Sequence, residues 1–164
     1  MQAYNWATNE ARWSQAQKLA SLNLQFRTKV QQLTAAMTRL GWKPKIFYAY
    51  RRPETQLELY RKGNSKVKFS FHNVKASNGA PAALGADIVD ERYGWGMRWD
   101  PVAKKDVPDA YKKRKSEEFF KAYGREAKRL GLFWGGDWNF RDDAHVQLLP
   151  NAALSQLARA AGVS

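Results

Sequence analysis

The sequence contains no cysteine, only two histidines and no long apolar run. Without cysteine the chain can form no disulfide, no catalytic thiol and no cysteine-bound zinc site. No stretch approaches the roughly 18 consecutive apolar residues of a membrane span. The N-terminus lacks a basic start followed by an apolar segment, so we expect no signal peptide and synthesis in a cytoplasm.

Negative charge is also scarce. The 28 lysines and arginines outnumber the 15 acidic residues and give a net charge of +13. Such a surplus attracts polyanions, among them nucleic acid, anionic cell-wall polymer and lipopolysaccharide, and charge alone does not select one of them. The chain has 164 residues, of which 44% are hydrophobic and 13% aromatic. These values predict one globular domain spanning residues 1–164.

Hydrophobic spacing predicts both helices and strands. The helices are expected at residues 9–40, with a break near 21–23, at a short segment opening on Pro53, at 116–130 and at 152–161. The strands are expected at residues 45–50, 85–89 and 146–149, and loops at 73–83 and 93–99. The tryptophans of the second loop, Trp95 and Trp99, either cap a core or line a cleft.

Both histidines lie in segments suited to a metal ion. His72 follows Ser70, and His145 follows an acidic segment; between them Asp87 stands in a short apolar strand. Two imidazoles and a carboxylate form a common ligand set for catalytic zinc, with one position left open. Each residue also has an ordinary structural interpretation, as a core histidine or as an acid that caps a turn. The combination is more informative than any member of it.

Two further residues suit the chemistry of a zinc hydrolase. Asp137 follows two glycines and lies near His145, so it is placed to act as the general base. Arg51 ends a predicted strand, and a cation there could stabilise a developing oxyanion.

Five segments occur in an order that resembles a known family. They are Tyr50–Gln56 (family pattern Tyr-Arg-Ser-x-x-x-Gln), Ser70–His72 (Ser-x-His), Leu84–Asp87 (Gly-x-Ala-x-Asp or a close variant), Leu130–Trp138 (Leu-Gly-x-x-Trp-Gly-Gly-Asp-Trp) and Asp143–Gln147 (Asp-x-Pro-His-x-Gln). This series resembles the M15 zinc peptidases, the group of D-Ala-D-Ala carboxypeptidases and L-alanyl-D-glutamate endopeptidases. Within that group it is most similar to the endopeptidases of phage endolysins.

The resemblance implies a role for each candidate residue. The implied roles are zinc ligand for His72, Asp87 and His145, catalytic base for Asp137, transition-state cation for Arg51, and substrate binding or polar support for Gln56, Ser70 and Trp138. Fourteen residues separate His72 from Asp87, more than is usual in the family, and residues 73–83 are interpreted as a surface insertion. A different register would make Asp90 the ligand, at the expense of the Gly-Ala-Asp match. Ala144 replaces the family's proline.

The resemblance also implies a fold and an activity. The fold is α+β: a small, mostly antiparallel sheet with surrounding helices, similar to hedgehog and D-Ala-D-Ala peptidase domains. The motif-bearing core covers about residues 45–149, and the helical region 9–40 packs on it. The implied activity is zinc-dependent hydrolysis of the peptidoglycan stem peptide, at the L-Ala-D-Glu bond, by a monomeric enzyme that reaches the cell wall during phage-induced lysis.

Two alternatives remain open from the sequence. One is a D,D-carboxypeptidase or dipeptidase that acts on D-Ala-D-Ala termini. The other is a basic module that binds nucleic acid or the cell envelope and holds zinc only for structure. Structural zinc sites usually fill all four positions with protein ligands, often cysteine, and the absence of cysteine counts against this second alternative.

Overall fold

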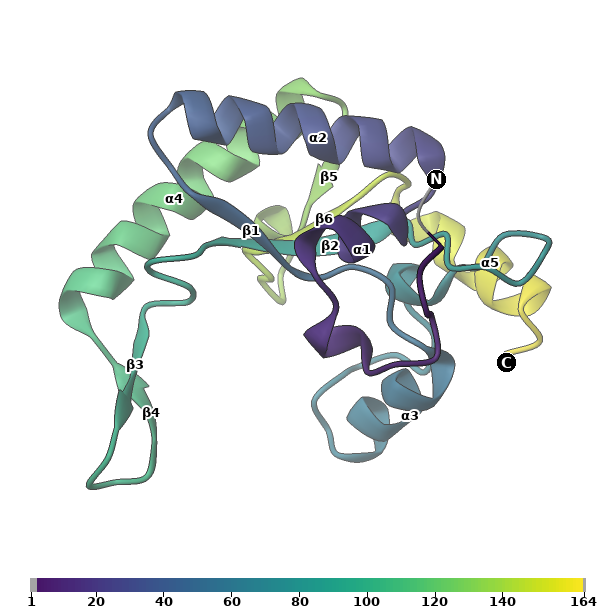
Figure 1. The fold of residues 1–164 in the computed structure, drawn as a ribbon, viewed down its shortest axis with the longest axis horizontal. Coiled ribbons are helices and arrows are strands. Elements are labelled where there is room, and N and C mark those ends of the chain that lie inside the picture. The colour runs from purple at the N-terminus through teal and green to yellow at the C-terminus, as the bar shows by residue number, and fades with distance from the viewer. Residues whose placement is uncertain (1–2, 164) are drawn as a thin grey trace.

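A four-stranded antiparallel sheet forms the centre of the structure, a computed structural model that describes residues 3–163 (Figure 1). Its strands lie in the order β1 (Pro44–Tyr48), β2 (Gly85–Asp90), β6 (His145–Gln147) and β5 (Phe133–Trp134). A separate hairpin of β3 (Met97–Asp100) and β4 (Lys105–Pro108) projects from the body. The predicted α+β class with small antiparallel sheets is confirmed.

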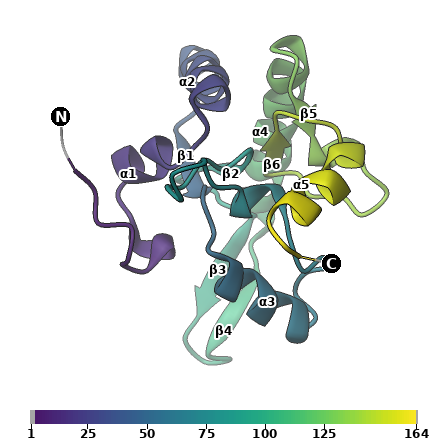
Figure 2. The ribbon, with the colours of Figure 1, turned by 90° about the vertical axis from the view of Figure 1, so that its right-hand side faces the viewer.

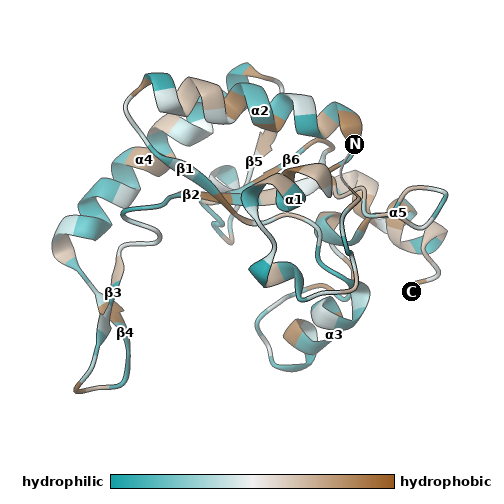
Figure 3. Cartoon of the chain, in the orientation of Figure 1, coloured by the Kyte–Doolittle hydropathy of each residue, from teal (hydrophilic) through white to brown (hydrophobic). Residues whose placement is uncertain are grey.

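Two long helices cover one face of the sheet: α2 (Leu24–Arg39) and α4 (Ala110–Arg129) (Figures 1 and 2). On α2 the buried residues Phe26, Val30, Leu33 and Met37 recur at steps of three and four, which gives the helix a single apolar stripe. Hydrophobic and hydrophilic residues alternate along both helices in Figure 3, as expected for elements with one buried face.

Side chains alternate between the two faces of the sheet along each strand, and this alternation determines which face of the sheet carries the candidate site. Ala86, Ile88 and Val146 are fully buried in the core beneath the two long helices. Because successive side chains of a strand point to opposite faces, Asp87 and His145 project to the other face. The short helix α3 (Pro53–Arg61) lies on that side of the sheet (Figure 2).

The N-terminal region protects the outer edge of β1. The short helix α1 (Gln15–Ala20) follows the one-turn helix η1 (Glu10–Arg12). The amide of Gln15 pairs with both the N–H and the carbonyl of Ile46, each at 2.8 Å, and the Lys18 ammonium donates to the Phe47 carbonyl. These side chains satisfy backbone groups that an edge strand would otherwise leave open to another chain.

The helical region breaks where the sequence predicted. α1 ends at Ala20 and α2 begins at Leu24, because the side chain of Asn23 accepts hydrogen bonds from the backbone N–H groups of Gln25 and Phe26. This N-cap sets the start of a new helix.

Two boundaries differ from the prediction. α4 begins at Ala110 rather than at residue 116, because the carboxylate of Asp109 caps it by accepting from the Lys112 backbone N–H at 2.9 Å. Residues 97–99 of the expected loop 93–99 belong to β3, which pairs with β4 from Met97↔Pro108 to Asp100↔Lys105. The glycines that suggested a loop make only the turn that precedes this strand.

The remaining short elements complete the architecture. They are the one-turn helices η2 (Phe71–Asn73), η3 (Gly135–Asp137) and η4 (Asn151–Ala153) and the C-terminal helix α5 (Leu154–Ala160). Among residues 3–163, no helix combines the length and apolarity needed to cross a bilayer.

Candidate metal centre and catalytic cleft

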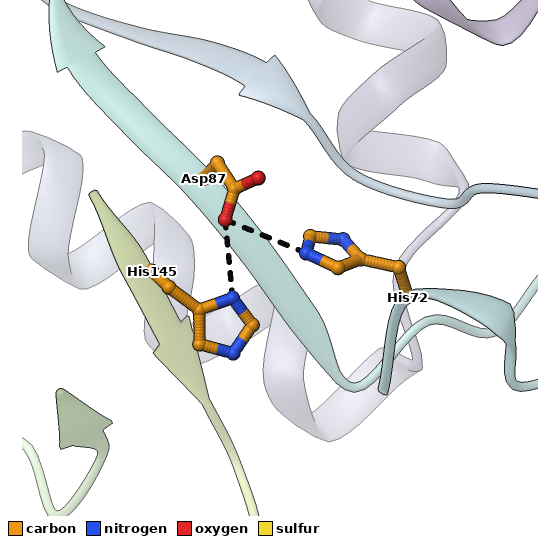
Figure 4. Close-up of side chains that lie close together, drawn as sticks. All are labelled: His72, Asp87 and His145. Carbon is orange, nitrogen blue, oxygen red and sulfur yellow. Dashed lines mark hydrogen bonds and ion pairs between the residues drawn. The ribbon is translucent and has the colours of Figure 1, made fainter. Parts of the chain in front are cut away.

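His72, Asp87 and His145 meet on the open face of the sheet (Figure 4). Asp87 on β2 and His145 on β6 are direct cross-strand partners, and His72 reaches in from η2. The Asp87 Oδ1 atom lies 3.1 Å from His145 Nδ1 and 3.4 Å from His72 Nε2. The strand pairing therefore brings together residues that are 58 positions apart in the sequence.

The protonation of His72 follows from its backbone contact. Its Nδ1 atom lies 2.7 Å from the carbonyl oxygen of Ala49, which can only accept a hydrogen bond. The proton of a neutral imidazole is thus assigned to Nδ1. The Nε2 atom keeps its lone pair, directed toward Asp87.

For His145 the assignment comes from Gln147. The amide nitrogen of Gln147 donates to the Leu149 carbonyl at 2.8 Å and to the Asn151 side-chain oxygen at 2.9 Å. The amide oxygen therefore faces His145 Nε2, at 2.8 Å, and must accept a hydrogen bond from it. This leaves the lone pair on Nδ1, again directed toward Asp87, and a polar partner of this kind is typical of a metal-bound histidine.

The three groups fit a zinc ion. Two imidazole lone pairs and a carboxylate oxygen converge, and such acceptors repel one another unless a proton or a cation lies between them. Tetrahedral zinc with bonds of 2.0–2.2 Å places neighbouring ligand atoms about 3.3 Å apart. The two separations from Asp87 Oδ1, 3.1 and 3.4 Å, bracket that value, and all three ligand atoms lie within 4.8 Å of one another. The cluster is a three-ligand site of the kind that leaves a fourth position for water or substrate.

The directions in which the pKa values of Asp87 and His145 shift agree with a site that binds a cation. Burial alone would raise the pKa of Asp87, but the charge of His72 and the hydrogen bonds from both histidines lower it far below its ordinary value. Burial alone would lower the pKa of His145, yet the hydrogen bond and charge of Asp87 raise it above 6.5. Without metal, the site therefore favours a proton where the ion would otherwise bind.

Arg51 is held beside the cluster by a buried network. Its guanidinium lies 4.3 Å from the centre of the Tyr48 ring, and its terminal nitrogen lies 4.0 Å from Asp87 Oδ2. It donates to the side-chain oxygen of Gln56 at 2.9 Å, and the Ser70 hydroxyl donates to the same oxygen at 3.2 Å. Gln56 is fully buried and is among the residues that line the cleft, and its hydrogen bond holds the Arg51 guanidinium in place.

Ser70 has a second role in the same network. Its hydroxyl accepts a hydrogen bond from the backbone N–H of His72 at 3.2 Å, while the Asn73 side-chain oxygen accepts one from the Ser70 backbone N–H at 2.7 Å. This reciprocal cap determines where η2 starts and thus where the His72 ring points.

Asp137 does not join the cluster. Its side chain is 52% exposed and lies 3.2 Å from the Lys128 ammonium on the surface of α4. It is not among the residues that line the cleft over the three candidate ligands. The expected base therefore lies away from the position that the sequence-based hypothesis required.

Asp142 occupies that position instead. It lines the cleft together with Asp87 and His145, and within residues 3–163 no hydrogen bond or ion pair engages its carboxylate. The residue is exposed to the cleft, yet the surrounding protein, and then the negative charge of Asp87, raise the pKa of its carboxyl group. A carboxylate that is accessible to water and has a raised pKa is suited to accept and return a proton.

The sequence held a signal for Asp142. The family pattern Asp-x-Pro-His places its acid three residues before the histidine. In register with His145, that position is Asp142, with Asp143 as the variable residue and Ala144 in place of proline. Asp137 also matches a family pattern, Trp-Gly-Gly-Asp-Trp, and from the sequence alone the role of base is assigned to it instead.

The Trp-Gly-Gly segment positions the loop that carries Asp142. The Trp134 indole N–H donates to the carbonyl of Asp143 at 2.7 Å. A Cβ atom on Gly124 would lie 2.4 Å from the Trp134 ring, and one on Gly136 would lie 2.1 Å from it. Only glycine leaves room for the ring at both positions.

Gly135 acts on Asp142 directly. Its carbonyl accepts the Asp142 backbone N–H at 3.0 Å, and a Cβ on Gly135 would lie 2.3 Å from the Asp142 carbonyl oxygen. Close packing around the loop therefore requires glycine at both Gly135 and Gly136, which also form the one-turn helix η3.

Aromatic residues form the walls of the cleft, which has a volume of about 720 Å³. The Trp138 ring lies 5.3 Å from that of His145, and Phe140, Phe47 and Trp95 line the opening. The placement of Trp138 is consistent with its predicted contact to substrate.

Replacing Gln147 with leucine should weaken metal binding. The change removes the acceptor for His145 Nε2, so the buried ring loses both its orientation and its favoured tautomer. We expect a roughly 10–100-fold loss of zinc affinity, as for other polar partners of metal-bound histidines. Competition with a chromogenic zinc chelator would measure it. An unchanged affinity would show that the cross-strand pairing alone orients His145.

Comparisons with known proteins found a matching family model and a similar solved structure. Residues 92–148 match the model of an M15 peptidase family described as D-alanyl-D-alanine carboxypeptidase. No curated protein matches the sequence at a significant level. The fold is similar to that of the Serratia marcescens L-Ala D-Glu endopeptidase ChiX, with a TM-score of 0.51, 21% sequence identity, and coverage of 86% of this chain and 89% of that one. The chain is therefore similar to an M15 peptidase family over residues 92–148, which include Asp142 and His145, and it shares the fold of the Serratia marcescens enzyme.

Proposed function

We propose that the protein is a zinc-dependent peptidase that hydrolyses an amide bond in the stem peptide of peptidoglycan. The observation that carries the proposal is the convergence of two imidazole lone pairs and one carboxylate oxygen in a cleft that also contains Asp142. The family match supports peptidase activity, and the name of the structural neighbour supports peptidoglycan as the substrate.

Three groups of the chain would act in the reaction. A zinc ion held by His72, Asp87 and His145 would supply Lewis-acid chemistry and a water that is acidic enough to react near neutral pH. Asp142 would accept the proton of that water and pass it to the leaving amine. Arg51, fixed by Gln56 and stacked on Tyr48, would stabilise the oxyanion of the tetrahedral intermediate.

Within this class we propose the L-Ala-D-Glu bond as the site of cleavage. The Trp-Gly-Gly-Asp-Trp segment resembles that of the endopeptidases, and the structural neighbour is named as an enzyme of that type. A D,D-carboxypeptidase must recognise the free C-terminal carboxylate of D-Ala. An endopeptidase instead needs a cleft open at both ends.

Digestion of purified sacculi tests the proposal. We expect fragments that carry a new N-terminal D-Glu, while L-Ala stays bonded to the sugar chain with its carboxylate newly exposed, as identified by mass spectrometry. A D-Ala-D-Ala peptide should remain intact under the same conditions. Release of terminal D-Ala alone would assign the enzyme to the carboxypeptidases, and salt-dependent DNA binding with no hydrolysis would favour the binding-module alternative.

We further propose that the enzyme acts as a phage endolysin at the host wall. The proposal rests on the motif resemblance and on the net charge of +13. Part of this charge lies on the first turns of α4, at residues 112–115, where it would favour approach to an anionic envelope.

A further inference from the structure

The β3–β4 hairpin creates a second groove beside the catalytic cleft. Phe47 and Trp95 pack edge to face, with ring centroids 4.7 Å apart, and both line the cleft and this second groove. The groove has a volume of about 390 Å³ and continues along Met97 and Trp99 of β3. In Figure 1 the hairpin projects from the body of the protein, and its residues Met97 and Trp99 are among those that line the groove.

Three large apolar side chains that line this groove are exposed to solvent. Trp99 is 59% exposed, Trp95 44% and Met97 40%. Met97 and Trp99 are two positions apart on one strand and so point to the same face of the hairpin. A cluster of large apolar side chains that no other part of residues 3–163 covers is typical of a ligand-binding surface.

The charges of the groove indicate what kind of ligand it suits. The charged side chains that line the groove are nearly balanced: four are basic (Lys45, Arg92, Arg98 and Lys112) and three are acidic (Asp90, Glu91 and Asp106). This mixture contrasts with the strong positive charge of the whole chain and does not suit a polyanion. Flat aromatic surfaces combined with a few donors and acceptors suit a neutral, hydroxyl-rich ring such as a sugar.

We propose that this groove binds a sugar of the peptidoglycan glycan strand while the attached stem peptide occupies the catalytic cleft. The inference rests on the proposed function and deepens it. The stem peptide begins at a lactyl group on the sugar, so the L-Ala-D-Glu bond lies only about two residue lengths, roughly 7 Å, from the ring. A terminal D-Ala-D-Ala bond lies about three residues, roughly 10 Å, farther away. A sugar groove that adjoins the cleft therefore also favours cleavage next to the glycan.

The test compares two substrates that differ only in the sugar. One is a disaccharide-linked stem peptide, and the other is the same peptide without the sugar. We expect the wild-type enzyme to show a higher kcat/KM on the first. Trp99→Ala should reduce that preference on the order of fivefold to tenfold, mainly through KM, as expected for the loss of one aromatic contact. Val102→Ala is the matched control, because this residue is 91% exposed at the tip of the same hairpin and does not line the groove.

Each other result would overturn the inference in a recognisable way. If the wild-type enzyme cleaves both substrates equally well, the proposed function stands and the sugar groove is wrong. If Trp99→Ala keeps the preference but loses binding to phosphatidylglycerol vesicles, the hairpin serves a lipid surface instead. If the zinc-loaded wild type cleaves neither substrate, the proposed function fails together with the inference.

Discussion

Replacing Asp142 with asparagine is expected to lower kcat by roughly 10²–10⁴-fold, while the protein keeps its metal and its fold. Asparagine has nearly the shape of aspartate but cannot accept a proton, so the change removes the base and little else. Steady-state kinetics on a stem-peptide substrate would measure the loss, and zinc content would be determined on the same sample.

Asp137→Asn provides the matched control. It changes the same chemical group five positions earlier in the chain, where the carboxylate pairs with Lys128 on the surface. We expect it to retain nearly full activity, because a surface ion pair contributes little. The opposite pattern, with Asp137→Asn inactive and Asp142→Asn active, would restore the role that the sequence first suggested for Asp137.

Removal of the metal is expected to abolish activity, and added zinc to restore it. About one zinc per chain should be bound, because one three-ligand cluster is present among residues 3–163. His72→Ala should lose most of its zinc affinity, since it removes one of three ligands while Asp87 and His145 remain paired across the strands.

The control for this prediction is a variant near the site that supplies no ligand. Asp90 lies three residues after Asp87 but pairs with Arg92 at 2.9 Å, and it also accepts the Lys43 backbone N–H. Asp90→Asn should therefore keep its zinc even if it lowers stability. Zinc loss in Asp90→Asn with retention in Asp87→Asn would mean that the alternative register is correct. Full activity of thoroughly metal-free protein would refute the zinc mechanism.

Local patterns of the sequence determined much of the fold. The three- and four-residue spacing on α2 and the short apolar run of β2 predict their elements, because a helix or strand must turn one regular face to the core. The candidate ligands His72, Asp87 and His145 were also predicted from their motifs, and the structure brings them together across a strand pair.

Only the tertiary structure shows that Asp142 lines the cleft while Asp137 pairs with Lys128 outside it. Both acids precede His145 in one short segment, and each matches a family pattern, Asp137 in Trp-Gly-Gly-Asp-Trp and Asp142 in Asp-x-Pro-His. The outcome depends on Trp134, whose ring packs against Gly124 on α4 and whose indole holds the Asp143 carbonyl. That contact between a helix and a loop turns Asp142 into the cleft and leaves Asp137 at the surface.

The ring nitrogens and the second groove were likewise beyond local reasoning. Which nitrogen of His145 is free depends on the hydrogen bonds that Gln147 makes with Leu149 and Asn151. The spacing of Trp95 and Trp99 is compatible with either a core or a cleft. Trp99 is exposed because it lies on the projecting hairpin, where no other layer covers the strand, and Trp95 lies in the turn that precedes it.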